Sequence, residues 1–560
     1  MLDSAAYRLC FADKVSAASV LIPLVRIFLW AATALLILYP LAMVFIGALF
    51  PGLLNDRPIQ LADLFSNHVR VAWLNTLQLG LTVSLMSLGL GVPLALLSAQ
   101  SDRSKWLDLI MSLPFLTPPF LSTLAWTLAV GRHGYLSRLG FPGEALQSYL
   151  FSFGGLSLLM ALHYTPIVYF VAHAQMARVP ASLLWAAQVS GASRFRVIAS
   201  VLVPLALPAL LGGGFLAFAA AIEEYGTPLV IGNRIGFPVV ATEIGRLVSV
   251  FPIQLTLASA LGATLMILVG VVYGLSLWLQ RRDVAYSSRC VYPPPELIPG
   301  SAAMLLWIFA GIYTLIAVVI PYSSIFLTSL LRLVSVGPAL SNLTAQIYSD
   351  LLASDSSGLR EALVVSLTLA LMAAILGALL GVGAVRDGAG LAALAMVPVA
   401  TPAITMAVGF IRAWNAPWTG MLPLYGTVSL VGLFYTAQYL PYAVQYARAG
   451  CSAIHPSYEW AARVHGARRL RTFGWIILPL LRPYCTAAAI MIFSISFREL
   501  VGSVLLRPPG VHTSSTFILA QFEQGSPAVG MAMGVIAITV AVVSTSAARK
   551  LGDEPHRARS

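Results

Sequence analysis

Charged residues are scarce in this sequence. Asp, Glu, Lys and Arg make up only 10% of its 560 residues, whereas hydrophobic residues make up 59%, and the mean hydropathy is +0.86. Soluble domains carry about a quarter charged residues, so this composition excludes an ordinary soluble protein. The sequence predicts an integral membrane protein.

Two further absences narrow the range of functions. The four cysteines, Cys10, Cys290, Cys451 and Cys485, form no CxxC pair and no spacing typical of a disulfide framework or a thiolate metal site. The GxxxxGK[ST] loop that holds ATP phosphates in many ATPases is also missing from the sequence. We therefore expect a chain that is not an enzyme and that binds no cofactor itself.

The alternating pattern of barrel strands is absent as well. Instead, apolar runs recur from Val25 almost to the C-terminus, each long enough to cross a bilayer as a helix of about 20 residues. We expect an all-α membrane protein with about twelve transmembrane helices. The predicted helices are 25–49, 72–98, 107–130, 154–176, 198–222 and 255–279 in the first half, and 302–331, 362–385, 391–411, 427–446, 475–497 and 530–547 in the second.

Positive charge exceeds negative charge, with 33 Lys and Arg against 21 Asp and Glu. This excess is compatible with nucleic acid binding, but the predicted topology places most basic residues on one side of the membrane. The positive-inside rule then explains the excess of positive charge better and puts both termini in the cytoplasm. We therefore expect no binding to nucleic acid. The first apolar run is too long for a signal-peptide core, and we interpret it as a retained helix.

The second half of the chain repeats the first. The stretch WAAQVSGASRFRVIASVLVP begins at Trp185, and WAARVHGARRLRTFGWIILP begins 275 residues later at Trp460. Six helices per half is an even number, so the halves are parallel repeats related by an axis along the membrane normal. We assign residues 1–283 to the first half, 284–300 to a cytoplasmic linker rich in proline and serine, and 301–560 to the second half.

Prolines recur in the third helix of each half. The segment LPFLTPPF, with Pro114 and Pro118, matches VPVATPAI, with Pro398 and Pro402. Proline removes a backbone donor and can kink a helix, although it is also common in membrane-spanning helices. These four prolines, together with the matched Pro166 and Pro441 in the fourth helices, are candidates for kinks or hinges along the pathway.

The repeated stretches lie in the loop between the fourth and fifth predicted helices of each half. Adjacent alanines favour helix there, and a glycine that follows can end the helix in a sharp turn. Each stretch thus predicts a compact helix-turn-helix knob that can seat in a groove of another protein. A basic helix that only anchors to lipid headgroups is the alternative, but duplication at matched topology argues against it.

This spacing resembles the EAA loop of ABC importer permeases, which runs Glu-Ala-Ala, three residues, Gly, nine residues, then Ile, any residue and Leu-Pro. The residues that match are Trp185, Ala186, Ala187, Gly191 and Pro204 in the first copy, and Trp460, Ala461, Ala462, Gly466 and Pro479 in the second.

The resemblance implies a type I ABC importer permease fold in the plasma membrane of a bacterium. It implies that the two loops are coupling helices that dock into two ATP-binding cassette ATPase subunits, which use ATP and Mg, while a periplasmic solute-binding protein delivers the solute and lipid surrounds the chain. The sequence departs from the family at Trp185 and Trp460, where Glu is usual. Aromatic packing then replaces a charge contact, or Glu459 supplies that contact one residue earlier.

Fused two-half permeases of this size resemble the ferric iron group of importers, and the segment from Arg498-Glu499-Leu500 to the Arg507 turn carries that resemblance. It implies ferric iron as the solute, with thiamine, 2-aminoethylphosphonate and polyamine as alternatives. An ion-coupled secondary transporter is a rival class, but such coupling usually requires ionisable residues inside the membrane, and this chain keeps most charges outside its helices.

Ionisable residues gather near the outer ends of the two fifth helices. They are Glu223, Glu224, Tyr225, Arg498 and Glu499. Ferric iron is a hard cation that prefers oxygen ligands, so these side chains are candidates for contact with it along the pathway. The alternative, which we favour, is that they orient an extracytoplasmic loop, pair with nearby arginines or receive the binding protein. The metal-ligating residues, if any, stay unassigned.

Overall fold

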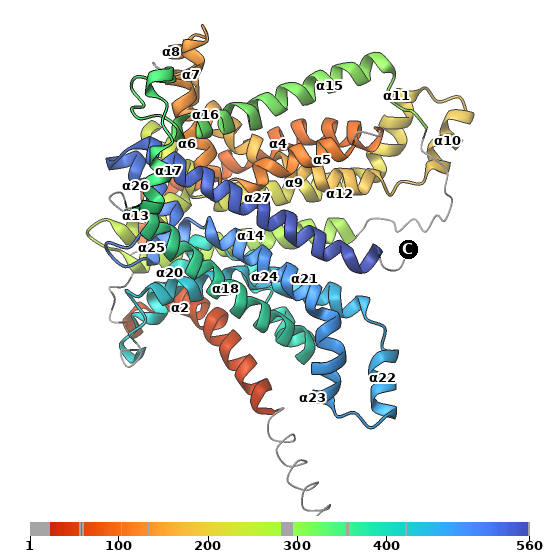
Figure 1. Cartoon of the computed structure of the whole chain (residues 1–560), viewed down its shortest axis with the longest axis vertical. Coiled ribbons are helices and arrows are strands. Elements are labelled where there is room, and N and C mark those ends of the chain that lie inside the picture. The colour runs from red at the N-terminus through yellow and green to blue at the C-terminus, as the bar shows by residue number, and fades with distance from the viewer. Residues whose placement is uncertain are drawn as a thin grey trace, which may run out of the picture. The chain divides into compact units, whose positions relative to one another are not determined.

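The computed structural model describes residues 23–54, 56, 58, 61–101, 104–131, 134–281, 295–353, 358–419 and 423–557. Within these residues nearly all regular structure is helical, and the only β-bridge recorded is an isolated one between Leu331 and Leu343. Most of the predicted linker, together with Cys10 and Cys290, lies outside the described residues. Figure 1 shows the helices that form the chain.

The expected all-α membrane architecture is confirmed. The described part of the chain has nine helices long and apolar enough to cross a membrane, or up to 11 if each of two bent helix pairs is one span. The tenth predicted helix, 427–446, also forms, as α21 (Val428–Ala453), but it is not among these apolar spans. It carries Tyr435, Gln438, Tyr439 and Tyr442, whose side chains are buried or half-buried within the protein, so its polarity does not face lipid.

The chain divides into two compact units that cut across the two halves predicted from the repeat. Unit 1 contains residues 1–46, 362–513 and 539–560, and unit 2 contains residues 47–361 and 514–538. The first spanning helix of the chain is therefore grouped with helices of the second half. Likewise, the first spanning helix of the second half is grouped with helices of the first. The repeat boundaries at 283 and 301 remain a prediction from the sequence.

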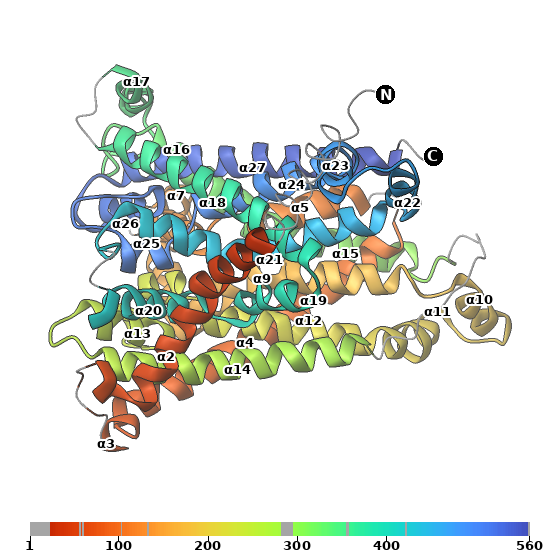
Figure 2. The ribbon, with the colours of Figure 1, turned by 90° about the horizontal axis from the view of Figure 1, so that it is seen from below.

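Unit 2 is built mainly from long helices that run side by side (Figure 2). Short helices lie at their two ends, except that α5 (Ser104–Leu116) packs alongside α9 (Phe153–Met176). The long helices are α4 (Asn67–Ala99), α9 (Phe153–Met176), α12 (Val203–Glu223), α14 (Leu255–Arg281) and α15 (Gly300–Thr314), the last continued by α16 (Ile320–Ser329). The shorter ones are α3 (Leu61–Leu64), α5 (Ser104–Leu116), α6 (Pro119–Val130), α7 (Tyr135–Arg138), α8 (Gly143–Leu150), α10 (Ala181–Val189), α11 (Arg194–Val197), α13 (Val240–Ser249), α17 (Gln346–Ala353) and α26 (Ser514–Gln524).

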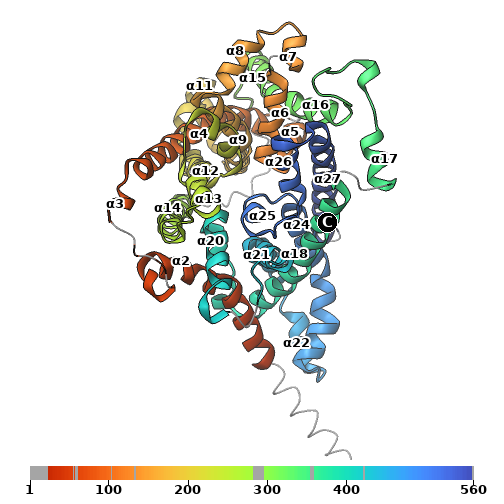
Figure 3. The ribbon, with the colours of Figure 1, turned by 90° about the vertical axis from the view of Figure 1, so that its left-hand side faces the viewer.

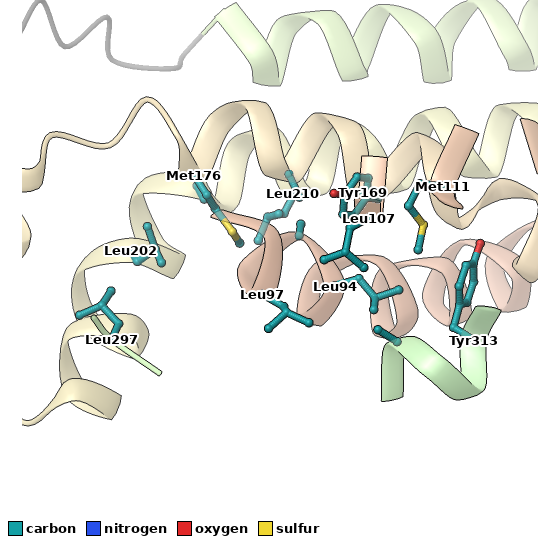
Figure 4. Packing of buried hydrophobic residues seen from close by; sticks show 14 of the residues in the cluster. Leu94, Leu97, Leu107, Met111, Tyr169, Met176, Leu202, Leu210, Leu297 and Tyr313 are labelled. Atoms are coloured by element: carbon teal, nitrogen blue, oxygen red, sulfur yellow. The ribbon is translucent and has the colours of Figure 1, made fainter. Parts of the chain in front are cut away.

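A hydrophobic cluster holds unit 2 together. Leu94, Leu107, Tyr169 and Leu210 come from four helices of the first half, and Tyr313 joins them from α15 (Figure 4). The Tyr313 hydroxyl donates a hydrogen bond of 2.9 Å to the carbonyl of Leu162 in α9. A buried tyrosine hydroxyl needs a hydrogen-bond partner, so this contact fixes α15 against α9.

Unit 1 contains the helices that follow residue 362 and the first span (Figure 3). Its elements are α2 (Tyr39–Leu49), α18 (Leu359–Asp387), α19 (Ala389–Leu394), α20 (Ala403–Trp414), α21, α22 (Ser457–Val464), α23 (Arg469–Thr472), α24 (Leu478–Phe497), α25 (Val501–Leu506) and the end of α27 (Pro527–Arg557). Arg26 lies 2.9 Å from Asp387, and the Tyr39 hydroxyl donates a 2.9 Å hydrogen bond to the Ala413 carbonyl. These contacts attach the first span to the second half.

Two of the six prolines that are candidates for kinks lie at sharp bends, whereas the other four lie within helical segments: Pro114, Pro166, Pro398 and Pro441. The helix pair that meets at Pro118 is bent by 93°, and the pair that meets at Pro402 is bent by 112°. Pro118 and Pro402 have nearly identical extended backbones, with φ and ψ of −57° and 135° in one and −54° and 135° in the other. Proline cannot donate a helical hydrogen bond and disfavours helix in the preceding residue, which explains both breaks.

Prolines also widen the helices without breaking them. A five-residue π-helical turn lies just before Pro40, Pro204, Pro321 and Pro479, in the first and fifth helices of the two halves. In each, a backbone N–H reaches the carbonyl five residues earlier, as Val203 does to Ile198. A wider turn relieves the clash between the proline ring and the preceding carbonyl, so the helix continues through the proline.

Candidate functional site

The first repeated stretch forms the knob expected from its sequence. In this first knob, residues 181–197, helix α10 ends at Gly191, which has a left-handed φ of +85°. The Gly191 N–H donates to the Gln188 carbonyl at 2.9 Å, and the Ala192 N–H donates to the Ala187 carbonyl at 3.0 Å. This pair of bonds is the Schellman ending of a helix, which requires a left-handed residue and therefore favours glycine.

The second knob, residues 457–472, has the same backbone geometry. Gly466 has φ +75°, its N–H donates to the Arg463 carbonyl at 2.9 Å, and the Ala467 N–H donates to the Ala462 carbonyl at 2.9 Å. A Cβ built on either glycine would meet no atom within 4 Å. The two turns thus need glycine for its conformation and not for lack of space.

Each knob exposes an apolar helix face at matched positions. Trp185 and Val189 are 43% and 87% exposed in the first knob, and Trp460 and Val464 are 61% and 84% exposed in the second. Each pair is spaced by four residues and so lies on one face of its helix. Ala186 and Ala461 are also exposed, whereas Ala187 is half-buried and Ala462 is buried. The face that a partner could contact is therefore aromatic and aliphatic.

The carboxylate of Glu459, next to Trp460 in the second knob, is paired with arginine side chains. It accepts a hydrogen bond of 2.8 Å from Arg386 at the end of α18, and Arg463 lies 3.8 Å away. The guanidinium of Arg386 also lies over the ring of Phe473, 5.6 Å from its centre. These contacts tie the second knob to α18, so Glu459 holds the knob in place within unit 1.

The knobs lead directly into the fifth helices. In the first half, α11 continues through the π-helical turn before Pro204 into α12, and in the second half α23 continues through the turn before Pro479 into α24. Within unit 2, α10 and α11 lie at the end opposite α13 (Figure 1). Each fifth helix is thus a continuous connection from its knob to the far end of its own unit.

Glu224 lies just beyond the end of α12. Its carboxylate accepts a hydrogen bond of 2.8 Å from the Tyr164 hydroxyl and one of 3.0 Å from the Thr227 N–H. Glu223 is the last residue of α12 and is half-buried. The Glu224 oxygens are therefore bound by groups of the chain itself, an arrangement that orients the segment after the helix.

Glu499 occupies the matching place in the second half. Its carboxylate accepts hydrogen bonds of 2.9 and 3.0 Å from the N–H groups of Gly502 and Ser503 at the start of α25. Burial raises the pKa of Glu499, although these hydrogen bonds act in the opposite direction. Arg498, the residue that ends α24, is half-buried. Both glutamates thus hold the N–H of the residue three positions later, Thr227 or Gly502, which favours the loop-orienting interpretation.

Tyr225 lines a cavity that was not predicted from the sequence. The wall of this cavity includes Glu243 of α13, which accepts hydrogen bonds from Arg246, at 2.9 and 2.5 Å, and from His68, at 2.9 Å. Burial raises the pKa of Glu243, but the hydrogen bonds from Arg246 and His68 outweigh it, so the pKa is lowered. Because His68 and Glu243 are 175 residues apart, no local pattern indicates their contact.

None of these clusters is a preformed metal centre. Among the described residues, no group of three or more His, Cys, Asp and Glu side chains is arranged to hold a metal ion. The two cysteines in this part of the chain, Cys451 and Cys485, are free thiols. Glu224 and Glu499 instead accept hydrogen bonds from backbone N–H groups of the segments that follow them.

Comparison with known proteins connects this architecture to transport. Residues 87–283, which include the first knob, match a family described as binding-protein-dependent transport system inner membrane component. The ferric transport system permease protein FbpB of Actinobacillus pleuropneumoniae is 26% identical over 522 residues, which cover 90% of this chain and 74% of that protein. The chain is an ABC importer permease. As such it works with a solute-binding protein and with ATPase subunits.

Two further relatives of this permease differ in how much they match. FbpB 1 of Haemophilus influenzae, which carries the name of a ferric transport permease, is 26% identical over 498 residues, 86% of this chain and 76% of its own length. PhnU of Salmonella choleraesuis, named for 2-aminoethylphosphonate transport, is 32% identical over 169 residues, 29% of this chain and 59% of its own length. The permease therefore resembles ferric permeases over most of its length and the phosphonate permease over one segment.

Proposed function

We propose that this permease imports ferric iron across the plasma membrane of a bacterium. Its resemblance to a ferric permease spans 90% of the chain and so includes both repeats. The 2-aminoethylphosphonate relative matches only 29% of the chain, which makes that solute the second candidate. A periplasmic binding protein delivers the solute, and both termini lie in the cytoplasm, because the positive-inside rule places the Arg-rich knobs on that side.

Two ATPase subunits bind this chain, one at each knob. The observation that carries this proposal is the matched pair of glycine-ended helices with exposed apolar faces. An exposed Trp and Val on one helix face suit a groove on a partner, as in helix-in-groove recognition. Since Trp185 and Trp460 replace the usual glutamate, aromatic packing supplies the contact, and Glu459 is committed to Arg386.

Each knob transmits ATPase closure to the fifth helix that follows it. The knob, the wide turn before Pro204 or Pro479 and the long helix form one continuous element in each half. Movement of the knob therefore shifts the far end of the helix, where Glu224 or Glu499 orients the next segment. Alternation between two arrangements of these elements opens the pathway to one side at a time. ATP and Mg are used by the partner subunits.

The experiment is ATP-dependent uptake into proteoliposomes that contain the permease, its ATPase and the binding protein encoded beside it. Uptake of ferric iron that excess 2-aminoethylphosphonate does not reduce is expected. Uptake of the phosphonate without iron would overturn the iron assignment and leave the permease assignment intact. ATP-independent uptake driven by an ion gradient would instead support the secondary-transporter class.

Coupling is tested separately with Trp185→Ala and Trp460→Ala. Each variant is expected to weaken binding of the ATPase and to lower uptake, and the double variant to abolish uptake, while membrane insertion is unchanged. The matched control is Trp30→Phe, which alters a tryptophan bonded to Asp387 and outside both knobs. Normal ATPase binding and uptake by the double variant would contradict the docking assignment.

A further inference from the structure

A cavity of about 860 Å³ opens in unit 2, at the end opposite α10 and α11. The N-terminal end of α4, the segment 225–238 and α13 form its walls, and Figure 2 shows α13 at that end of the unit. The Val240 N–H donates to Thr76 at 2.8 Å, and the Asn75 amide donates to the Pro238 carbonyl at 2.9 Å. These bonds join α13 and the preceding segment to α4, so the walls hold a fixed shape.

The carboxylate in the wall of this cavity already accepts hydrogen bonds from side chains of the protein. Glu243 is only 2% exposed, and its two oxygens accept three hydrogen bonds from Arg246 and His68. A cation ligand at Glu243 would have to displace those donors and face the positive charge of Arg246. The cavity is therefore poorly suited to a free metal ion.

Hydrogen-bond donors, in contrast, remain available around the cavity. An arginine has five N–H donors, and Arg246 uses only its Nε and one terminal nitrogen, Nη2, on Glu243. The side chains of Tyr225 and Asn233, which also line the cavity, donate no hydrogen bond to any described residue. The side chains of Arg246 and His68 are 48% and 54% exposed, so both reach the open space.

Apolar groups complete the lining. They are Val71, Leu229, Phe237, Pro238 and Val250. Apolar surroundings lower the local dielectric and strengthen hydrogen bonds to a charged ligand. A partly apolar lining that presents unused guanidinium N–H groups favours a compact ligand with negatively charged oxygen atoms.

We propose that this cavity binds a small soluble oxyanion, one that carries a phosphate, phosphonate or carboxylate group. Arg246 contacts the ligand oxygens, with Tyr225 and Asn233 as further donors. Glu243 acts as a positioning residue, because its buried carboxylate holds the guanidinium of Arg246 in place. The proposal does not depend on iron as the imported solute, and oxyanion binding is measurable without transport.

The test is ³¹P line broadening of inorganic phosphate by the purified full-length permease in a detergent that lacks phosphate. Saturable broadening is expected for the wild type. Arg246→Gln removes the free guanidinium donors, and Asn233→Asp places a carboxylate beside the ligand. Each is expected to weaken phosphate binding at least tenfold. Arg178→Gln, which removes an exposed arginine near the end of α9, is the matched control and should bind phosphate like the wild type.

Asn233→Asp keeps the test decisive even if Arg246→Gln does not fold, because the Asn233 side chain makes no hydrogen bond within the described structure. Phosphate binding that is unaffected by both variants would show an adventitious ion only and would overturn the proposal. Loss of phosphate binding in nanodiscs of phosphatidylglycerol, but not in detergent, would assign the cavity to a lipid headgroup and would overturn the soluble ligand. Failure of iron uptake with phosphate binding intact would affect only the proposed cargo.

Discussion

Tyr164 donates a hydrogen bond to Glu224 at 2.8 Å, and this bond joins the middle of the fourth helix to the end of the fifth. The positions that match them in the second half are Tyr439 and Glu499, yet Tyr439 contacts Tyr442, with ring centres 6.4 Å apart, and makes no recorded bond to Glu499. There Ser503 bonds to Glu499 instead, and Tyr435 lies 2.6 Å from Ser503. The two matched glutamates thus accept side-chain hydrogen bonds from different residues, Tyr164 in the first half and Ser503 in the second.

This difference predicts unequal effects of two matched substitutions. Tyr164→Phe leaves an oxygen of Glu224 without its donor and should destabilise the protein by about 1–3 kcal/mol, the usual cost of a buried polar group left without its hydrogen-bond partner. Tyr439→Phe removes a hydroxyl without such a bond and should cost clearly less. Thermal unfolding of both purified variants in detergent measures this, and equal losses would show that the bond to Glu224 adds nothing.

The glycine that ends each knob predicts a dependence on backbone conformation. Gly191 and Gly466 have φ of +85° and +75° with open space around them. Asparagine tolerates this left-handed region, whereas valine is strained there by about 1–2 kcal/mol. Gly191→Asn should therefore keep ATP-driven uptake near the wild-type rate, and Gly191→Val should reduce it severalfold with insertion unchanged. If both variants behaved alike, bulk and not conformation would control the knob.

Glu243 predicts a pH dependence of stability. Its folded-state pKa is lowered, so the charged carboxylate stabilises the fold above the unfolded-state pKa of about 4.3. That stabilisation is lost as the pH falls through the folded-state pKa. The thermal midpoint of the wild type should hence decrease more between pH 5 and strongly acidic pH than that of Glu243→Gln. Parallel pH profiles of the two proteins would contradict a stabilising role for this carboxylate.

The close approach of the first span to α20 predicts the effect of a single methyl group. A Cβ on Gly409 would lie 2.5 Å from the Pro40 carbonyl oxygen, within unit 1. Gly409→Ala should therefore destabilise the protein by about 1–3 kcal/mol through overpacking. Gly270→Ala in α14, where a Cβ meets no atom within 4 Å, is the control and should not destabilise. Equal thermal midpoints for the two variants would show that the first span yields to the methyl group.

Local chemistry made much of this architecture predictable. Apolar runs, the prolines at Pro118 and Pro402 and the glycines at Gly191 and Gly466 act on the backbone within a few residues, so their effects can be predicted in sequence order. Because the chain contains two repeats, each of these local patterns occurs twice. The sequence also predicted the helix at 427–446, which forms as α21 although it is less apolar than the nine spans of the described residues, because its polar side chains are covered by protein.

The sequence by itself determined the helices, their kinks, the two knobs and the importer resemblance, since each depends on neighbours along the chain. Only the tertiary structure decided that the first helix of each half is grouped with the other half, that Tyr164 holds Glu224, and that His68 and Arg246 surround Glu243. The physical reason is that burial and hydrogen bonding join residues by distance in space, and a contact across 175 positions such as His68 to Glu243 leaves no periodic trace in the sequence.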